Sequence, residues 1–155
     1  MTVSSYVKFD GIPGSVESGS QAGNSECYEF RYEINMPVDP RDGSITGRRQ
    51  HGSFSLTIEM GKETPLLAKH LCDNIEIPKV EVFHFKPDPA SGDIKKYFTH
   101  EMKKVKVVGL TVYKLNTCSD ESKRYRDMCV ANMRFEEITI KDEEGNEYTD
   151  AWMLS

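Results

Sequence analysis

The sequence predicts a mainly β fold, an antiparallel β-barrel of two sheets with one short α-helix at about residues 65–72. In most segments, apolar and polar residues alternate, which is the pattern of a strand with one buried and one wet face. Clusters of Gly, Pro, Asn and Asp separate these segments, and helical spacing occurs in one place. With 155 residues, the chain is long enough for a core of its own, so residues 1–155 are predicted to form a single domain.

The N-terminal strands are the first elements. Residues 3–9 are predicted to form a strand that ends in the turn sequence DGIPG. After a small, polar loop, residues 27–34 (CYEFRYEI) alternate and predict a half-buried strand. On that strand, the expected inward side chains are Tyr28, Phe30, Tyr32 and Ile34, and the expected outward side chains are Glu29, Arg31 and Glu33.

A long loop and a third strand follow. Residues 37–50 are rich in glycine, proline and charge, and a loop of this length is usually either functional or unstructured. Residues 51–60 alternate again and predict a strand. Its expected inward side chains are Phe54, Leu56, Ile58 and Met60.

The segment KETPLLAKHLCD, residues 62–73, has the helical pattern. Thr64 suits the N-cap, and Pro65 suits the first helical position, where no N–H donor is needed. A helix of about eight residues is not stable alone, so its apolar face must pack on the sheet. The residues expected on that face are Leu67, Ala68, Leu71 and Cys72.

The C-terminal half predicts further strands. Residues 77–86 form one, and residues 94–115 are too long for one flat strand, so they should form two strands or one bent strand. The bend is expected near Lys103–Lys104 or at Gly109. The last expected elements are a strand at 125–140 and a closing hairpin at 141–154, with Gly145–Asn146 near its tip.

Catalytic chemistry finds little support in the sequence. His70 and Cys72 are two residues apart on the predicted helix, so their side chains point about 200° apart and cannot act together. The other histidines, His51, His84 and His100, lie in strand patterns without a second histidine at ligand spacing, and no phosphate loop or hydrolase motif occurs. The prediction is a protein that is not an enzyme, with no catalytic residue, no metal ligand and no cofactor. An enzyme that uses His70, Cys72 or a cross-strand carboxylate pair stays an alternative.

The charge distribution limits the partners. The formal net charge of −5 disfavours a nucleic-acid partner. Residues 95–106 carry five lysines beside Tyr97 and Phe98, so a single-stranded nucleic-acid-binding β-barrel is an alternative. A solvated strand face, whose lysines prevent aggregation, is favoured. The acidic segment 142–150 contrasts with these lysines, so copies of the chain can meet head to tail and close into a ring.

Location and redox state follow from what the chain lacks. No run of about 18 or more apolar residues occurs, so no membrane span is predicted. The N-terminal segment does not have the pattern of a secretory signal peptide, so export would need a route that does not use one. The four cysteines are then expected to be reduced and mostly buried, with a Cys118–Cys129 disulfide as a disfavoured alternative.

The order and spacing of four blocks carry a family resemblance. The blocks are YVKFDGIPGSV at 6–16, DGSITGRRQHGSFSLTIEMGKETPLLAKHL at 42–71, KVEVFHFKPDPASGDIKKYFTHEMKKVKVVGL at 79–110, and MRFEEITIKDEEGNEYTDAWM at 133–153, with its late Trp152. Together they resemble the haemolysin-coregulated protein (Hcp) family, the tube subunits of the type VI secretion system. The resemblance covers nearly the whole chain.

The resemblance implies a barrel of two antiparallel sheets with the short helix on its flank, and a homohexameric ring. Rings of the family stack into a tube inside a contractile sheath, whose contraction drives the spike-tipped tube, with effectors in its channel, into a neighbouring cell. The implied partners are therefore further copies of the chain, sheath and spike proteins, and effector proteins. The implied location is the cytoplasm during assembly and the outside of the cell afterwards, reached without a signal peptide. Because few residues follow Trp152, a tube subunit without a C-terminal toxin domain is expected.

The resemblance also implies two sets of site residues. The loop 37–50 matches the extended loop that family members use in ring–ring contacts. The stacking candidates are Arg41, Asp42, Arg48 and Arg49. The strand 27–34 matches a strand that lines the channel. The channel candidates are Glu29, Arg31 and Glu33. A bacteriophage-type tail-tube protein, which shares the fold and the ring, stays the nearest alternative.

Overall fold

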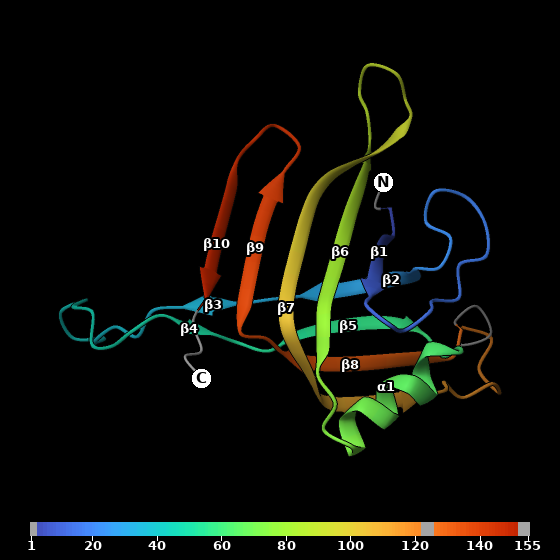
Figure 1. Cartoon of the computed structure of the whole chain (residues 1–155), viewed down its shortest axis with the longest axis horizontal. Coiled ribbons are helices and arrows are strands. Elements are labelled where there is room, and N and C mark those ends of the chain that lie inside the picture. The colour runs from blue at the N-terminus through green and yellow to red at the C-terminus, as the bar shows by residue number, and fades with distance from the viewer. Residues whose placement is uncertain (1–2, 122–125, 152–155) are drawn as a thin grey trace.

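Alternating apolar and polar residues form strands over most of the chain. The computed structural model describes residues 3–121 and 126–151 and is shown in Figure 1. Trp152, the late tryptophan of the family resemblance, lies outside these residues. The strands are β1 (Ser5–Phe9), β2 (Ser25–Arg31), β3 (Ile34–Asn35), β4 (Gln50–His51), β5 (Phe54–Glu59), β6 (Ile77–Pro87), β7 (Ile94–Tyr113), β8 (Met128–Arg134), β9 (Glu137–Asp142) and β10 (Glu147–Ala151), and the helix is α1 (Glu63–Cys72).

Strand β7 closes the barrel because it has three neighbours. Hydrogen bonds connect β7, β6, β1, β2, β5 and β8 in that order, and β8 pairs again with the second half of β7. Strands β9 and β10 extend the sheet on the other side of β7. In Figure 1, β10, β9, β7, β6 and β1 run nearly vertically in front, and β2, β5 and β8 cross behind them. We call these two layers the front sheet and the back sheet. The predicted antiparallel barrel of two sheets with one short helix is confirmed.

The bend in β7 is the point where the two sheets join. Up to Val105, β7 pairs with β6 and β9, and from Lys106 onward it pairs with β8. Lys104 has a φ of 55°, which is uncommon for a residue with a side chain and turns the strand sharply. The register also shifts between Val107 and Gly109. The long segment is therefore one bent strand, with irregularities at both of the predicted positions.

Inward side chains of both sheets form the core. On β5, Phe54, Leu56 and Ile58 are buried as predicted, and they pack in one cluster with valines of β1 and β6. Met60 is exposed because β5 ends at Glu59, so its predicted inward position is wrong. Closing a sheet on itself in this way removes unpaired edges from the barrel.

Strand β2 is shorter than predicted, and its alternation is interrupted. Its register with β5 shifts between Cys27 and Glu29. This bulge turns Cys27 inward and leaves Tyr28 exposed. Ile34 belongs to the separate strand β3 and is also exposed, so the predicted inward positions of Tyr28 and Ile34 are wrong. The residues of this segment that do pack against the core are Phe30 and Tyr32.

Helix α1 packs against β7 at the lower end of the barrel in Figure 1. The helix begins at Glu63, so Thr64 lies in the first turn, and its predicted place at the N-cap is wrong. The Thr64 hydroxyl accepts a hydrogen bond from the Gly61 N–H at 3.2 Å. Leu67 is fully buried, but Cys72 is exposed, so the predicted place of Cys72 on the packed face is wrong.

The cysteines divide into a buried pair and an exposed pair. Cys27 and Cys129 are buried, and burial raises the pKa of both thiols. Cys72 and Cys118 are exposed, so the expectation of mostly buried cysteines holds for two of the four. All four are free thiols, and the alternative Cys118–Cys129 disulfide is not formed in this structure.

Candidate assembly surfaces

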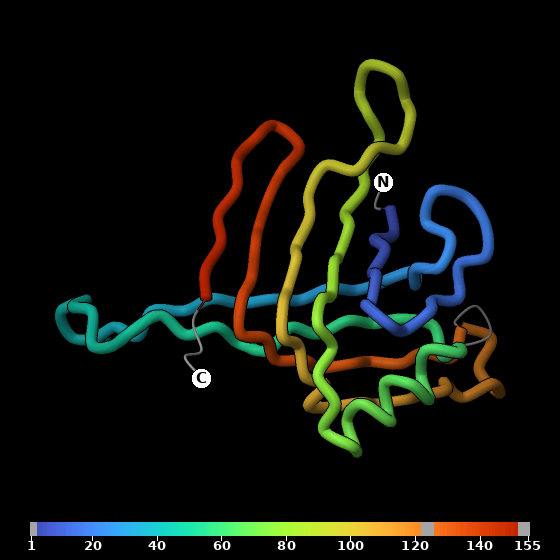
Figure 2. The backbone as a smooth tube through the Cα atoms, viewed as in Figure 1, coloured from blue at the N-terminus to red at the C-terminus, as the bar shows by residue number. Residues whose placement is uncertain are grey.

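A hairpin projects from the barrel where the sequence predicts a long loop. We call residues 34–51 the arm; in it β3 pairs with β4, and an isolated bridge joins Val38 to Ile45. The arm extends away from the body of the molecule in Figure 2. It has no core of its own, and exposed aliphatic side chains that gather on one element suit contact with another chain. The exposed aliphatic residues of the arm are Ile34, Met36, Val38 and Ile45.

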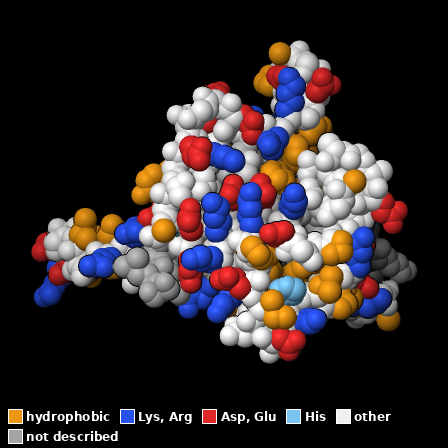
Figure 3. Space-filling view, in the orientation of Figure 1, with side chains coloured by type: hydrophobic (Ala, Val, Ile, Leu, Met, Phe, Trp, Pro, Cys, Tyr) orange, Lys and Arg blue, Asp and Glu red, His pale blue; other side chains and the backbone are white. Residues whose placement is uncertain are grey.

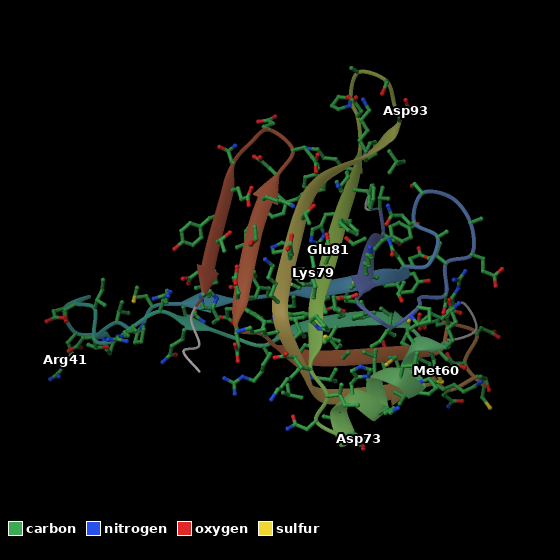
Figure 4. The ribbon with its side chains drawn as sticks, in the orientation of Figure 1. Arg41, Met60, Asp73, Lys79, Glu81 and Asp93 are labelled. Carbon is green, nitrogen blue, oxygen red and sulfur yellow. The ribbon has the colours of Figure 1, made fainter. Side chains whose placement is uncertain are left out.

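Side-chain carboxylates stabilise the turn at the tip of the arm. Asp39 Oδ1 accepts a hydrogen bond from the Arg41 N–H at 2.8 Å, and Asp42 Oδ1 accepts one from the Ser44 N–H at 2.9 Å. The Ser44 hydrogen bond lowers the pKa of the Asp42 carboxyl. The Arg41 side chain is 90% exposed and lies at the far end of the arm in Figure 4. The candidates Arg41 and Asp42 therefore lie together at the tip.

The base of the arm is fastened to β10. The Arg49 guanidinium donates to both carboxylate oxygens of Asp150, at 2.5 and 2.8 Å, and this contact lowers the pKa of the Asp150 carboxyl. His51 Nε2 lies 2.8 Å from the same carboxylate, and the Tyr32 hydroxyl is hydrogen-bonded to His51 Nδ1. Of the four stacking candidates, Arg49 thus anchors the arm, whereas Arg48 is exposed beside it.

The outward face of the back sheet is a second polar surface. Glu29 and Arg31 of β2 lie opposite Thr57 and Ser55 of β5, and Asn132 of β8 lies opposite Ser55 on the other side. Glu29 and Arg31 are exposed, so the structure places these two channel candidates together on this face. The third candidate, Glu33, is exposed beyond the end of β2, next to the root of the arm.

The outward face of the front sheet carries a ladder of ion pairs. Lys79 lies 3.2 Å from Glu81 and 3.5 Å from Glu101, and Glu101 also lies 4.0 Å from Lys103 and 3.7 Å from Lys141. Figure 3 shows this mixture of blue and red side chains, and Figure 4 labels Lys79 and Glu81 within it. Pairing with carboxylates reduces the positive charge that a nucleic acid would need. The lysines of the 95–106 segment with a carboxylate within 4.0 Å are Lys95, Lys96, Lys103 and Lys104.

Two histidines meet between the sheets. His84 Nε2 lies 3.0 Å from His100 Nδ1, Ser5 Oγ lies 2.8 Å from His84 Nδ1, and the Phe30 ring packs against both imidazoles. Burial lowers the pKa of both histidines, that of His100 to about 4, with the neighbouring His84 as a second cause. Sequence spacing does not reveal this contact, because it depends on the β6–β7 register, in which Val82 lies opposite His100.

A buried carboxylate fastens α1 to the barrel. Glu63 is 1% exposed, and it accepts hydrogen bonds from Ser15 Oγ at 3.0 Å and from Ser25 Oγ at 2.8 Å. A buried charge without hydrogen bonds would be strongly unfavourable, so these hydroxyl groups are required partners. The contact joins the helix, β2 and the loop before β2. A glutamate at a helix start is normally exposed, which explains why the sequence pattern gives no sign of it.

His70 and Cys72, the pair considered for catalysis, lie two residues apart near the end of α1. His70 Nδ1 donates to the Leu66 carbonyl at 2.7 Å, one turn back, and Cys72 is exposed at the end of the helix. Within residues 3–121 and 126–151, no three His, Cys, Asp or Glu side chains are placed to hold a metal ion. In the same residues, none of the helices has the length and apolar character needed to span a membrane.

These features define the class of the protein as a closed β-barrel with polar outward faces and a projecting arm, and solved structures share its fold. A crystal structure of an Hcp protein matches with a TM-score of 0.87 and 19% identity, over 97% of this chain and 100% of that one. Hcp1 from E. coli EAEC 042 matches with a TM-score of 0.81 and 27% identity, over 99% of each chain.

Sequence comparison identifies the family. The family model described as "Type VI secretion system effector, Hcp" matches residues 6–141. The "Major exported protein" of Pseudomonas aeruginosa is 30% identical over 91 residues, which is 59% of this chain and about half (52%) of that relative. The chain belongs to the Hcp family of type VI secretion systems, and the resemblance stated from the sequence is confirmed.

Proposed function

We propose that the chain is the structural subunit of a type VI secretion tube. Homohexameric rings stack into the inner tube, and contraction of the sheath expels the tube with effectors in its channel. Besides family membership, the observation that carries this proposal is the arm, whose aliphatic side chains are exposed at the end of a stable barrel. Apolar side chains that gather exposed on one element mark a contact with another chain, and the next ring of a stack would cover them.

The direction of the arm suggests how the subunit sits in the tube. In Figure 1 the arm continues the line of β2 and β5, across the direction of the front strands. If the arm contacts the next ring, the strands of the back sheet run along the tube axis. Their polar outward face, with Glu29 and Arg31, then lines the bore together with Glu33, and the ion-pair ladder of the front sheet faces outward, toward the sheath.

The arm residues then take separate roles. Val38 and Ile45 pack against the next ring, while Arg41, Asp42 and Arg48 make polar contacts there. Arg49 has a different task, because its ion pair with Asp150 holds the arm at a fixed angle to the barrel. No part of this role requires catalysis, a metal or a cofactor.

The proposed cellular location of the chain follows from its role in a tube that is assembled inside the cell and then expelled. The chain assembles with sheath and spike proteins in the cytoplasm and leaves the cell as part of the tube. The P. aeruginosa relative is named a major exported protein, which supports export.

Sedimentation velocity of the purified chain tests the assembly. We expect a species of six times the 17.6 kDa chain mass, whose fraction falls as salt screens the charged surfaces. A strict monomer at all protein and salt concentrations would overturn the proposal.

A further inference from the structure

The two sheets of the barrel are offset along the direction of the front strands. At the upper end in Figure 1, the β9–β10 hairpin and the adjoining part of β7 extend beyond β2, the uppermost strand of the back sheet. At the lower end, the back sheet continues past the bend of β7, and α1 packs against β7 there. Each sheet therefore has one end that the other sheet does not cover.

Apolar side chains line the uncovered end of the front sheet. Ile138 of β9 is buried in the core, and Ile140 lies on the same face two residues further along. Tyr148 of β10 lies opposite Ile140 and has an exposed fraction of 65%. Phe98 of β7, Ile140 and Tyr148 form the apolar lining of an open groove of about 330 Å³. We call these three residues the overhang groove, which continues the core face of the front sheet beyond the end of the back sheet.

Apolar side chains are also exposed at the uncovered end of the back sheet. Val112 lies opposite the buried Cys129, so it shares the core face of that sheet, yet 46% of it is exposed. Met60 and Ile75, which lie before and after α1, are exposed as well. Figure 3 shows hydrophobic side chains gathered around α1 at the lower end of the molecule. We call Met60, Ile75 and Val112 the lower apolar surface.

Unpaired charges of opposite sign accompany the two apolar surfaces. Glu144 and Glu147 are exposed on the β9–β10 hairpin, which carries the overhang groove. Lys62 and Lys69 are exposed at the start and in the last turn of α1, beside the lower apolar surface. Within residues 3–121 and 126–151, none of these side chains has a group of opposite charge within 4.0 Å. The carboxylates of one surface thus match the ammonium groups of the other.

The two surfaces lie at opposite ends of the barrel, so they cannot meet within one chain. A contact between them joins different copies and is heterologous, and such a contact closes into a ring when the rotation permits. In Figure 1, the offset between the sheets runs across the direction of the arm. The contact therefore lies within one ring, and the outward face of the back sheet stays open to the bore.

We propose that the overhang groove of each subunit covers α1 and the lower apolar surface of the next copy in the same ring. This inference rests on the proposed tube function and names its lateral contact. The occupant is a second copy of the chain because the charges of the two surfaces are complementary and the offset sheets leave core faces uncovered at opposite ends. Apolar burial supplies affinity in such a contact, and the charge pairs fix its orientation and register.

Charge reversal tests the contact with the full chain. The hairpin variant carries Glu144→Lys and Glu147→Lys, and the helix variant carries Lys62→Glu and Lys69→Glu. Where the wild type is mainly ring, each variant alone should form about tenfold less ring by sedimentation velocity. An equimolar mixture of the two variants should restore rings, because the reversed hairpin fits the reversed helix and the two unchanged surfaces fit each other.

A chain that carries all of these reversals is the matched control. Its net charge equals that of the wild type, and its two reversed surfaces fit each other, so it should form rings by itself. Lys8→Glu and Glu17→Lys reverse charges at exposed positions elsewhere and should assemble as the wild type does. Circular dichroism and thermal unfolding establish that each variant is folded.

The apolar part of the contact is tested at Tyr148. Tyr148→Ser should reduce the fraction of ring about tenfold, because buried aromatic side chains contribute much of the binding energy of an interface, and Tyr148→Phe should assemble normally. If the wild type forms rings and Tyr148→Ser or the reversal variants do so equally, the contact is wrong while the tube function stands. The same holds if neither the mixture nor the chain with all reversals restores rings. A wild type that never forms rings overturns both.

Discussion

The barrel and the arm are built from neighbouring strands but are stabilised in different ways. The barrel closes on itself through β7 and buries a core in which Phe54, Leu56 and Val80 have no exposed surface. In the arm, β3 pairs with β4, and one isolated bridge lies beyond this pair. The aliphatic side chains of the arm remain exposed, and Ile45 has an exposed fraction of 67%. Burial of apolar surface is the main stabilising term in folding, so the barrel supplies the stability and the arm contributes little.

This difference separates folding from assembly. Changes in the barrel core should unfold the subunit, whereas changes in the arm should leave a folded subunit that cannot stack. The contact of Arg49 and His51 with Asp150 is the point where the two regions meet.

Phe54→Ala should have the largest effect. It removes a fully buried ring from the centre of the core and should lower the free energy of unfolding by about 3–5 kcal/mol. Chemical denaturation measures the change, and Phe54→Leu, which keeps most of the volume, should lose less. A loss below about 1 kcal/mol for Phe54→Ala would show that the core is not as closely packed as the structure describes.

Glu63→Ala should come next. It removes the acceptor of the Ser15 and Ser25 hydroxyl groups and leaves the buried Ser25 hydroxyl without a partner, which costs about 1–3 kcal/mol of unfolding free energy. The same denaturation measurement applies. The isosteric Glu63→Gln should lose less because its side-chain oxygen still accepts a hydrogen bond, and equal stability of Glu63→Ala and wild type would contradict the fastening role.

Acid should destabilise the barrel through His100. Burial lowers its pKa to about 4 in the folded chain, whereas the unfolded chain takes up the proton near pH 6.5. Its contribution is therefore complete above pH 6.5 and is lost as the pH falls toward 4, with a decrease of about 3 kcal/mol. His84, whose pKa is also lowered by burial, acts in the same direction.

Denaturation curves at several pH values measure this dependence. His100→Asn should flatten the curve between pH 6.5 and 4, because it removes the larger of the two shifted groups. If wild type and His100→Asn show the same slope in that window, the imidazole is not kept neutral by the fold.

Asp150→Asn should loosen the base of the arm. It weakens the charge-assisted hydrogen bonds from Arg49 and removes the ionised partner of His51. Amide hydrogen exchange should speed up about severalfold in residues 34–51 and stay unchanged in β5 and β6. Asp93→Asn, at an exposed turn, is the control, and faster exchange throughout the barrel would argue against a local anchor.

Val38→Ser with Ile45→Ser should have the smallest effect on the subunit. Both side chains are exposed, so the free energy of unfolding should stay within about 0.5 kcal/mol of the wild-type value. Stacking of rings, followed by electron microscopy at high protein concentration, should nevertheless be lost. Stacks of normal length in this double variant would remove the arm from the contact between rings.

Local sequence pattern predicts the barrel well because the alternation of apolar and polar residues within a strand indicates which face of that strand is buried. The bend of β7 at Lys104 and the closing hairpin at Gly145 also follow from local signals, namely excess strand length and turn residues. The bulge of β2 does not, because the shift between Cys27 and Glu29 is defined only against the partner strand.

The candidate surfaces were less predictable because they depend on contacts between distant segments. Arg49 is a stacking candidate by its place in the loop, yet its partner Asp150 lies about a hundred residues away, and no local pattern links them. His84 with His100 and Glu63 with Ser15 are hidden for the same reason. Arg41 and Asp42 are candidates because the loop resembles a family loop; the structure places both at the exposed tip of the arm, and their stacking role stays a prediction.

Cryo-electron microscopy of the purified wild-type chain tests the central claim most directly. The account predicts six-fold annular particles with an open bore, with Glu29 and Arg31 on the inner wall and the arms on one face of the ring. Separate particles of the 17.6 kDa chain at every protein concentration, with the arm folded back on its own barrel, would contradict it.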